Sequence, residues 1–240
     1  MLPKILIAVA LLVGSIFVVS GFLGHKDEIL QNIKPKGNTP LQNLGASACP
    51  DPLILQTPVD IGKVTGILYP GQERGGHFKY HGGFRFDNSK ATEIEVKAPM
   101  DAYITDAAQY IENDKVQYMF DFQNDCGIRY RFDHLVTLSP KLAKIAEGLP
   151  EAKVDDSMTT RINEEITVIQ GEVIATAVGY PDNVFVDFGV YDTRKGSPLQ
   201  SFQEKAVCWF DLLPAQDSAK VKSLPPADSK SGTQSTLCKP

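Results

Sequence analysis

The sequence predicts a mainly β, mostly antiparallel domain with one short helix, preceded by an N-terminal transmembrane helix. Short runs of β-branched and aromatic residues recur between positions 63 and 192, separated by Gly, Asn, Asp and Pro. No series of alternating strands and helices interrupts them, which argues against a parallel, doubly wound sheet. Near the N-terminus, residues 5–23 contain no charged residue. These three observations together predict the fold class.

The N-terminal apolar run is predicted to be an uncleaved membrane anchor over residues 1–24. As a helix, residues 5–23 would span roughly 28 Å, about the thickness of the hydrocarbon layer. Lys4 precedes the run, so the positive-inside rule predicts a cytoplasmic N-terminus and an extracytoplasmic remainder. A cleaved signal peptide is the alternative, but its apolar region is usually shorter and ends in an A-x-A-like site. The sequence GFLGHKDE after the run offers no such site.

Composition divides the rest of the chain into three parts. Residues 25–47 are polar and contain Pro, Gly and Asn, which predicts a flexible stalk. Residues 48–214 carry the strand signals and are expected to form the folded domain. Residues 215–240 lack aromatic residues and are rich in Ser, Lys, Pro and Asp, which predicts a disordered tail. The net charge of −5 argues against a nucleic-acid partner, which usually requires a basic excess.

The strands are expected in order along the folded part. Each candidate is short, alternates or clusters apolar residues, and ends at a turn-forming residue. The runs are GKVTGILYP, HGGFRFD, TEIEVKAP, AYITDAAQYI, KVQYMFDF, GIRYRFDHLV, EEITVIQGEVIATAVG and NVFVDFGVYD. The segment PKLAKIAEGLP at 140–150 has helical spacing and a Gly-Leu-Pro stop, so it is the predicted helix.

The cysteines predict disulfides in an oxidising compartment. Cys49, Cys126, Cys208 and Cys238 are even in number, and none lies in a C-x-x-C motif of the zinc-ribbon or thioredoxin kind. Four cysteines allow three pairings, and the sequence does not choose among them. We expect a bond between Cys49 and Cys208, because it would close the two ends of the folded domain.

Several stretches, taken in order, resemble the lysostaphin/LytM-type zinc endopeptidase family. HGGFRF resembles the H-x-G-x-D-F strand of that family, VKAPMDAYITDA resembles V-x-A-P-x-D-G-x-V, and RYRFDHLVTLS resembles the Y-x-H-L-S strand. VIQGEVIATAVG resembles V-x-x-G-x-x-I-G-x-x-G, and NVFVDFGVYD falls where the family has H-L-H-F-E-V. The resemblance covers about residues 65–192 and is carried by order and spacing. It implies an antiparallel folded-over β-sheet, or hybrid barrel, of the LytM peptidase type.

The resemblance also implies which positions would form a zinc site. The family holds zinc through the His and Asp of its first motif and the second His of H-x-H, and two further histidines assist attack by a metal-bound water. Here His81 matches the first ligand and His134 matches the catalytic histidine of Y-x-H-L-S. Arg85 stands at the Asp ligand position, Phe185 at the first His of H-x-H, and Asp187 at the second. The site is therefore degenerate.

Arginine cannot ligate zinc because it remains protonated in proteins. We therefore expect Arg85 to take the place of the metal and to form an ion pair with Asp187, with Phe185 filling the pocket. On this interpretation no cofactor is bound.

The alternative keeps a metal, with zinc as the possible cofactor. His81, Asp87 and Asp187 would then be the ligands, His77 a spare ligand, and His134 a catalytic residue. Asp87 lies two residues beyond the expected ligand position, about 6.6 Å along a regular strand, so this set requires a bulge at Gly82-Gly83.

The sequence thus predicts a membrane-anchored, extracytoplasmic pseudoenzyme of the LytM-like type. Its expected role is non-catalytic binding or regulation at the cell envelope, with a cell-wall peptide, a glycan or an envelope protein as ligand. One alternative is a zinc metallopeptidase, a cell-wall hydrolase with altered ligands. Another is a hybrid-barrel structural adaptor, suggested by the similarity of KAPMDAYI to carrier and adaptor barrels.

Overall fold

The computed structural model describes residues 49–239 and confirms the mainly β class. The predicted anchor at 1–24 and stalk at 25–47 lie outside the described residues. Within the described part, no helix is both long and apolar enough to span a bilayer. The strands are β1 Gly66–Leu68, β2 Gln72–Arg74, β3 His77–Lys79, β4 Gly82–Arg85, β5 Val96–Lys97, β6 Ala102–Glu112, β7 Lys115–Gln123, β8 Ile128–Leu138, β9 Lys153–Val154, β10 Thr160–Arg161, β11 Thr167–Val168, β12 Val173–Val178 and β13 Phe185–Asp192.

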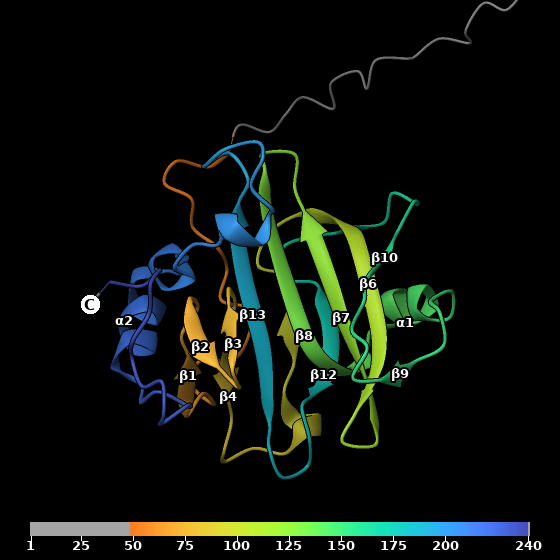
Figure 1. Cartoon of the computed structure of the whole chain (residues 1–240), viewed down its shortest axis with the longest axis horizontal. Coiled ribbons are helices and arrows are strands. Elements are labelled where there is room, and N and C mark those ends of the chain that lie inside the picture. The colour runs from red at the N-terminus through yellow and green to blue at the C-terminus, as the bar shows by residue number, and fades with distance from the viewer. Residues whose placement is uncertain (1–48, 240) are drawn as a thin grey trace, which may run out of the picture. The chain divides into compact units, whose positions relative to one another are not determined.

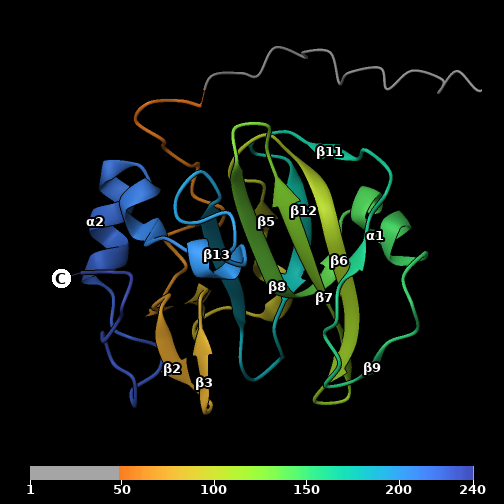
Figure 2. The same cartoon turned by 45° about the horizontal axis from the view of Figure 1, so that its top comes forward.

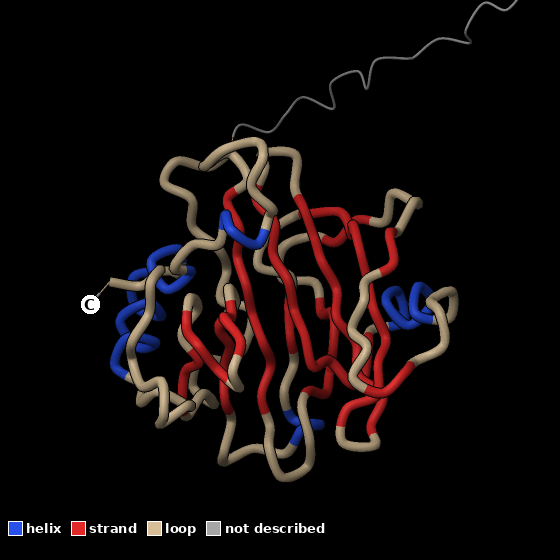
Figure 3. The backbone as a smooth tube through the Cα atoms, viewed as in Figure 1, coloured by secondary structure: helices blue, strands red, loops and turns tan. Residues whose placement is uncertain are grey.

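Helices are few and lie at the periphery of the sheet (Figure 3). The α-helices are α1 Pro140–Ala146 and α2 Ala215–Ser223, and the 3-10 turns are η1 Ala91–Glu93, η2 Gln203–Lys205 and η3 Trp209–Leu212. Helix α1 confirms the prediction at 140–150. Helix α2 was not predicted, and it lies at the opposite side of the sheet from α1 (Figure 1).

A largely antiparallel sheet forms the body of the domain, in the order β1-β4-β13-β8-β7-β6-β10 (Figure 1). Strands β6, β7 and β8 are long and consecutive, and they pair as two hairpins. The β6–β7 turn places Asn113 and Asp114 at φ 48° and 59°, the left-handed pair that a tight hairpin turn requires. A separate hairpin, β2–β3, stands beside β4 and carries His77.

One face of the sheet packs an aromatic core because side chains alternate along each strand. Phe84 of β4, Phe132 of β8 and Phe188 of β13 are fully buried and stack in a row, with Phe132–Phe188 ring centroids 4.9 Å apart. Trp209 covers the row, with its ring centroid 4.7 Å from that of Phe84. The opposite face of the same strands is polar and carries the residues described in the next subsection.

Strand β8 changes its partner halfway along its length. Residues 128–133 pair with β13, whereas residues 135–138 pair with β12. On the other side, Tyr118 and Phe120 of β7 face Leu135 and Phe132, so Asp133 and His134 together oppose one residue. This is a β-bulge, a device that redirects side chains and ends regular pairing. The turned view in Figure 2 shows β12 and β5 behind the front strands.

The segment predicted to be a disordered tail is folded, so that prediction is wrong. Helix α2 buries Val221 completely, and the chain then returns along β1. There Ile67 N–H donates to Pro225 O at 3.0 Å, and Ala227 N–H donates to Ile67 O at 2.8 Å. These bonds occupy backbone groups that an edge strand would otherwise expose. At the other side, residues from β9, β10 and β11 pair with β6.

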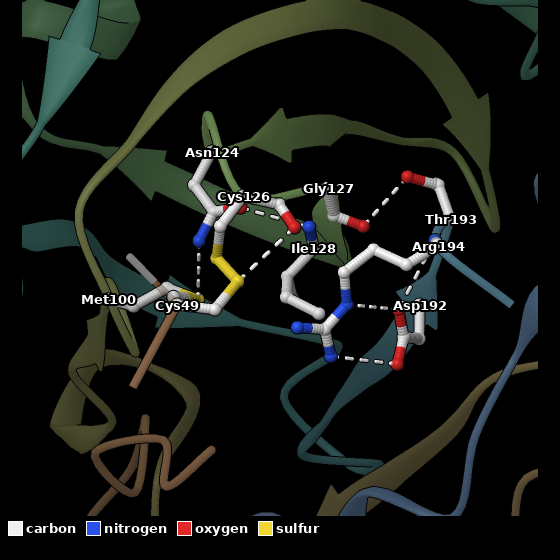
Figure 4. The surroundings of a disulfide bond; sticks show 9 residues. All are labelled: Cys49, Met100, Asn124, Cys126, Gly127, Ile128, Asp192, Thr193 and Arg194. Carbon is white, nitrogen blue, oxygen red and sulfur yellow. Dashed lines mark hydrogen bonds and ion pairs between the residues drawn. A yellow bond between two sulfur atoms is a disulfide. The ribbon is translucent and has the colours of Figure 1, made fainter. Parts of the chain in front are cut away.

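All four cysteines form disulfides, as the even count predicted. The bonds are Cys49–Cys126 and Cys208–Cys238, so the expected Cys49–Cys208 pair is wrong. The first bond ties the start of the described domain to the turn between β7 and β8. The second ties the C-terminal segment to Cys208, just before η3. Figure 4 shows Cys49 against the β7–β8 turn, where Asn124 also accepts a hydrogen bond from Ile128 N–H at 2.9 Å.

Candidate functional site

The polar face of the sheet brings His81 and Asp187 into contact. Asp187 of β13 lies directly opposite Gly83 of β4 and Asp133 of β8. His81 is two residues before Gly83, so strand alternation places it on the same face. The Nε2 atom of His81 lies 2.9 Å from Oδ2 of Asp187. The contact brings together two residues that the metal-binding alternative placed in one site, here as a direct pair.

Two glycines leave the space in which this contact forms. A Cβ atom at Gly83 would lie 2.9 Å from Oδ1 of Asp187, and one at Gly189 would lie 3.0 Å from Cβ of His81. Pairing between β4 and β13 is regular at these residues. The bulge at Gly82-Gly83 that the metal-binding alternative required is therefore absent from this pairing. The HGG sequence instead provides close approach of the His81 segment to β13.

His134 joins the pair from the bulge of β8. Its φ of 62° lies in the left-handed region of backbone conformation, which is uncommon for residues other than glycine. Nε2 of His134 lies 3.7 Å from Oδ2 of Asp187, and Nδ1 lies 2.6 Å from Oε1 of Gln117. Because that amide oxygen only accepts hydrogen bonds, Nδ1–H donates to it, and Nε2 is the nitrogen that faces Asp187. Phe185 packs its ring on the imidazole, with centroids 4.4 Å apart.

Asp133, Tyr110 and Gln117 belong to the site but were not predicted from the sequence. Tyr110 OH donates to Oδ1 of Asp133 at 2.6 Å, and the backbone N–H of His134 donates to the same oxygen at 2.8 Å. Burial, followed by the Asp133 carboxylate, raises the pKa of Tyr110 well above its usual value. Regular alternation would separate Asp133 from His134 on opposite faces, and the bulge is what brings them together. The adjacent Asp-His dipeptide was the only sequence signal.

Asp187 is ionised and held by its neighbours. Burial alone would raise its pKa, but the charge and hydrogen bond of His81, with His134 and Arg74, outweigh burial and lower the pKa from 3.8 to about 2. The carboxylate is nearly enclosed, with the residue 8% exposed.

This lowered pKa predicts an acid-sensitive contribution to stability. The contribution is complete above about pH 4 and is lost as pH falls from about 4 to 2, because the unfolded chain binds the proton first. We expect it to amount to about 2 kcal/mol. Urea unfolding of the wild type and Asp187→Asn at pH 2, 3, 4 and 5 should show that the difference in unfolding free energy shrinks toward pH 2. A difference that stays constant over this range would contradict the assignment.

Arg85 does not pair with Asp187, so the predicted metal-replacing ion pair is wrong. Nε of Arg85 lies 2.6 Å from Oδ1 of Asp87, and Thr65 Oγ1 donates to the other oxygen of Asp87 at 2.9 Å. The register explains this, because Arg85 lies opposite Phe185. Asp87 is two residues away from Arg85 on the same face and toward solvent, so it is the nearer carboxylate. Asp187 already forms its ion pair with His81.

The same contacts bear on whether the family's zinc site fits this chain. Asp87 is held by Arg85 and Thr65, so it does not join His81 and Asp187. His77 is exposed on the β2–β3 hairpin. Across residues 49–239, no group of three or more His, Cys, Asp or Glu side chains is arranged to hold a metal ion. The described residues therefore do not fit the zinc site that the resemblance implies.

A pocket of about 540 Å³ opens over His81, His134 and Asp187. Its floor is the polar face of the sheet, and its walls come from β3, η2 and the segment between β9 and β10. The lining residues are Lys79, His81, Tyr110, Glu112, Met119, Arg131, Asp133, His134, Asp155, Ser157, Met158, Thr159, Asp187 and Gln203. A larger pocket of about 740 Å³, between the 56–63 segment and η1, contains none of the predicted site residues.

No protein-family model matches the chain, and no curated protein matches it. The likeness to the lysostaphin/LytM type therefore depends only on the sequence stretches quoted in the sequence analysis.

Proposed function

We propose that this chain is a membrane-anchored, extracytoplasmic binding module of the LytM-like type whose pocket is non-catalytic and metal-free. The observation that carries the proposal is the state of the three expected site residues. His81, His134 and Asp187 converge in one pocket, but both histidines face the Asp187 carboxylate, with Nε2 of each at 2.9 and 3.7 Å from Oδ2. A zinc site instead requires three protein ligands arranged around one centre.

The surroundings of these residues favour binding over turnover. Gln117 and Asp187 each hold one histidine, and Phe185 packs against His134. The pocket is large enough for part of a peptide or a sugar and is lined by polar groups from several elements. Two disulfides support an oxidising, extracytoplasmic location. A cell-wall peptide, a glycan or an envelope protein is the proposed class of ligand.

Metal content and envelope binding test this proposal together. The full-length chain, purified in detergent without chelator, should contain far less than one zinc per chain and should co-sediment with purified peptidoglycan. His134→Asn, which tolerates the left-handed backbone, should weaken co-sedimentation about tenfold. His77→Asn, on the exposed hairpin outside the pocket, is the matched control and should bind as the wild type does.

Three results would contradict the proposal. Stoichiometric zinc that is lost in His81→Ala, together with cleavage of peptidoglycan peptides, would identify a hydrolase. Equal binding by the wild type and His134→Asn would place the ligand elsewhere on the domain. Absence of binding by the wild type to peptidoglycan and to solubilised envelope proteins would remove the binding role.

A further inference from the structure

The β2–β3 hairpin and the residues that follow it supply one wall of the pocket around His134 and Asp187. Lys79, at the end of β3, and His81, just before β4, both line the pocket. The hairpin forms a two-stranded sheet of its own. A two-stranded hairpin is at best marginally stable by itself, so contacts from outside the hairpin must fix this wall.

Arg74, the last residue of β2, makes such a contact with the backbone of His81. Nη2 of Arg74 donates to His81 O at 3.0 Å, and Nη1 donates to Tyr69 O at 2.6 Å. Nη1 also lies 3.3 Å from Oε1 of Gln72, its acceptor within β2. The guanidinium is a rigid fork of donors, so it can hold two carbonyl groups at once. Arg74 therefore fixes the backbone of His81, whereas Asp187 holds its side chain.

The charge of Arg74 connects the pocket with the C-terminal segment. Arg74 is half-buried, and burial lowers its pKa from the usual value. The charges of Asp187 and Asp228 act in the opposite direction. Asp187 belongs to the pocket and Asp228 to the segment after α2, so Arg74 interacts with a carboxylate from each region.

Residues 225–238, which we call the strap, run beside β2 and the turn that precedes it (Figure 1). Nε2 of Gln72 donates to Gly232 O at 2.9 Å, and Gln72 is 3% exposed. Thr236 N–H donates to Gly71 O at 2.9 Å. A Cβ atom at Gly71 would lie 2.8 Å from Oγ1 of Thr236, so the strap and the turn are in close contact. The strap thus holds the residues that lead directly to Arg74.

The Cys208–Cys238 disulfide secures the end of the strap at the same turn. Cys238 N–H donates to Oγ of Ser235 at 2.8 Å, and this hydroxyl donates to Pro70 O. Only one side chain therefore separates the covalent bond from the turn before β2. Loss of the disulfide would release the strap from the hairpin and leave the residues of the pocket unchanged in identity.

We propose that Arg74 is a positioning residue of the pocket that holds His81 in place for a ligand, and that the strap controls ligand binding by holding Arg74. The inference rests on the proposed binding function and specifies how that site is controlled. A ligand binds more tightly to a side chain that is already ordered, because binding then does not bear the cost of ordering it. Release of the strap or loss of Arg74 leaves His81 mobile and weakens binding.

Two disulfide variants of the full-length chain, purified in detergent, test the control by the strap. Cys208→Ser with Cys238→Ser should shift and broaden the NMR signals of the His81 imidazole. It should also weaken co-sedimentation with purified peptidoglycan about threefold to tenfold. Cys49→Ser with Cys126→Ser is the matched control, because it removes a disulfide at the β7–β8 turn, and it should change neither measurement. Both variants are compared at a temperature at which the NMR signals of the aromatic core show that they are folded.

Substitutions of Arg74 test its positioning role directly. Arg74→Gln keeps one hydrogen-bond donor but loses the charge and the fork, and it should shift the His81 signals and weaken co-sedimentation about threefold to tenfold. Arg74→Lys keeps the charge and should restore part of the binding. Arg194→Gln is the control, because Arg194 pairs with Asp192 and lies outside the pocket lining.

The outcomes separate this inference from the proposed function. Unchanged His81 signals in Arg74→Gln and in the strap variant would overturn the inference, whatever the wild type binds. Wild-type co-sedimentation by both variants, or equal losses in the two disulfide variants, would overturn the control of binding by the strap. A wild type that does not bind peptidoglycan would contradict the proposed function, and the His81 signals would still decide whether Arg74 and the strap position this residue.

Discussion

Removal of the Cys49–Cys126 disulfide by substitution of both residues with serine should lower the free energy of unfolding by about 4.5 kcal/mol. The bond closes a loop with a sequence separation of 77, so it restricts the unfolded chain strongly. It also joins the start of the described domain to the β7–β8 turn (Figure 4). Urea unfolding of the oxidised protein and the double variant measures the difference.

The second disulfide provides the matched comparison. Cys208–Cys238 has a sequence separation of 30, for which loop entropy alone predicts a loss of about 3.6 kcal/mol. Cys238 is 6% exposed and anchors the returning C-terminal segment against the domain. If removal of Cys208–Cys238 costs more than removal of Cys49–Cys126, loop entropy is not the main term, and contacts of the C-terminal segment dominate. Losses below 1 kcal/mol for both variants would contradict a stabilising role for either bond.

The sequence could predict the parts of this structure that depend on strand alternation. His81, Asp187 and the aromatic residues of β4, β8 and β13 lie on the faces that a two-residue period implies. The mainly β class and helix α1 follow from the same local patterns. These features depend on near neighbours in the chain, and local patterns contain that information.

The features that could not be predicted depend on irregular backbone or distant contacts. The bulge at Asp133 and His134 reverses the expected face of one residue, and no residue type in that stretch requires it. Arg85 was assigned to Asp187 by family position, whereas the register gives it Asp87. The C-terminal segment has a disordered composition, but a disulfide, the burial of Val221 and backbone hydrogen bonds to β1 hold it on the domain.

Asp121→Ala should destabilise the domain by about 3–5 kcal/mol, because it leaves two guanidinium groups without their shared carboxylate. Arg131 donates to both oxygens of Asp121, and Arg129 Nη2 lies 3.9 Å from one of them. Burial would lower the pKa of Arg131, but the hydrogen bonds and charge of Asp121 outweigh it and raise the pKa. Phe202 lies over Arg129, 4.0 Å from the guanidinium carbon to the ring centroid, and limits access of water.

Asp106→Ala is the matched control, since Asp106 is a second carboxylate beside Arg129. Asp106 is bonded to Arg129 at 3.1 Å and is more exposed than Asp121. In the Asp106→Ala variant, Arg129 would still have the Asp121 carboxylate as a neighbour of opposite charge. We expect a loss of no more than about 1 kcal/mol. Urea unfolding measures both losses. The wild type, Asp121→Ala, Arg131→Ala and the variant with both of these substitutions together form a double-mutant cycle. A coupling energy near zero between Asp121 and Arg131 would mean that water takes the place of the Asp121 carboxylate. The segment that carries Phe202 would then have to move away from the polar face of the sheet to admit that water.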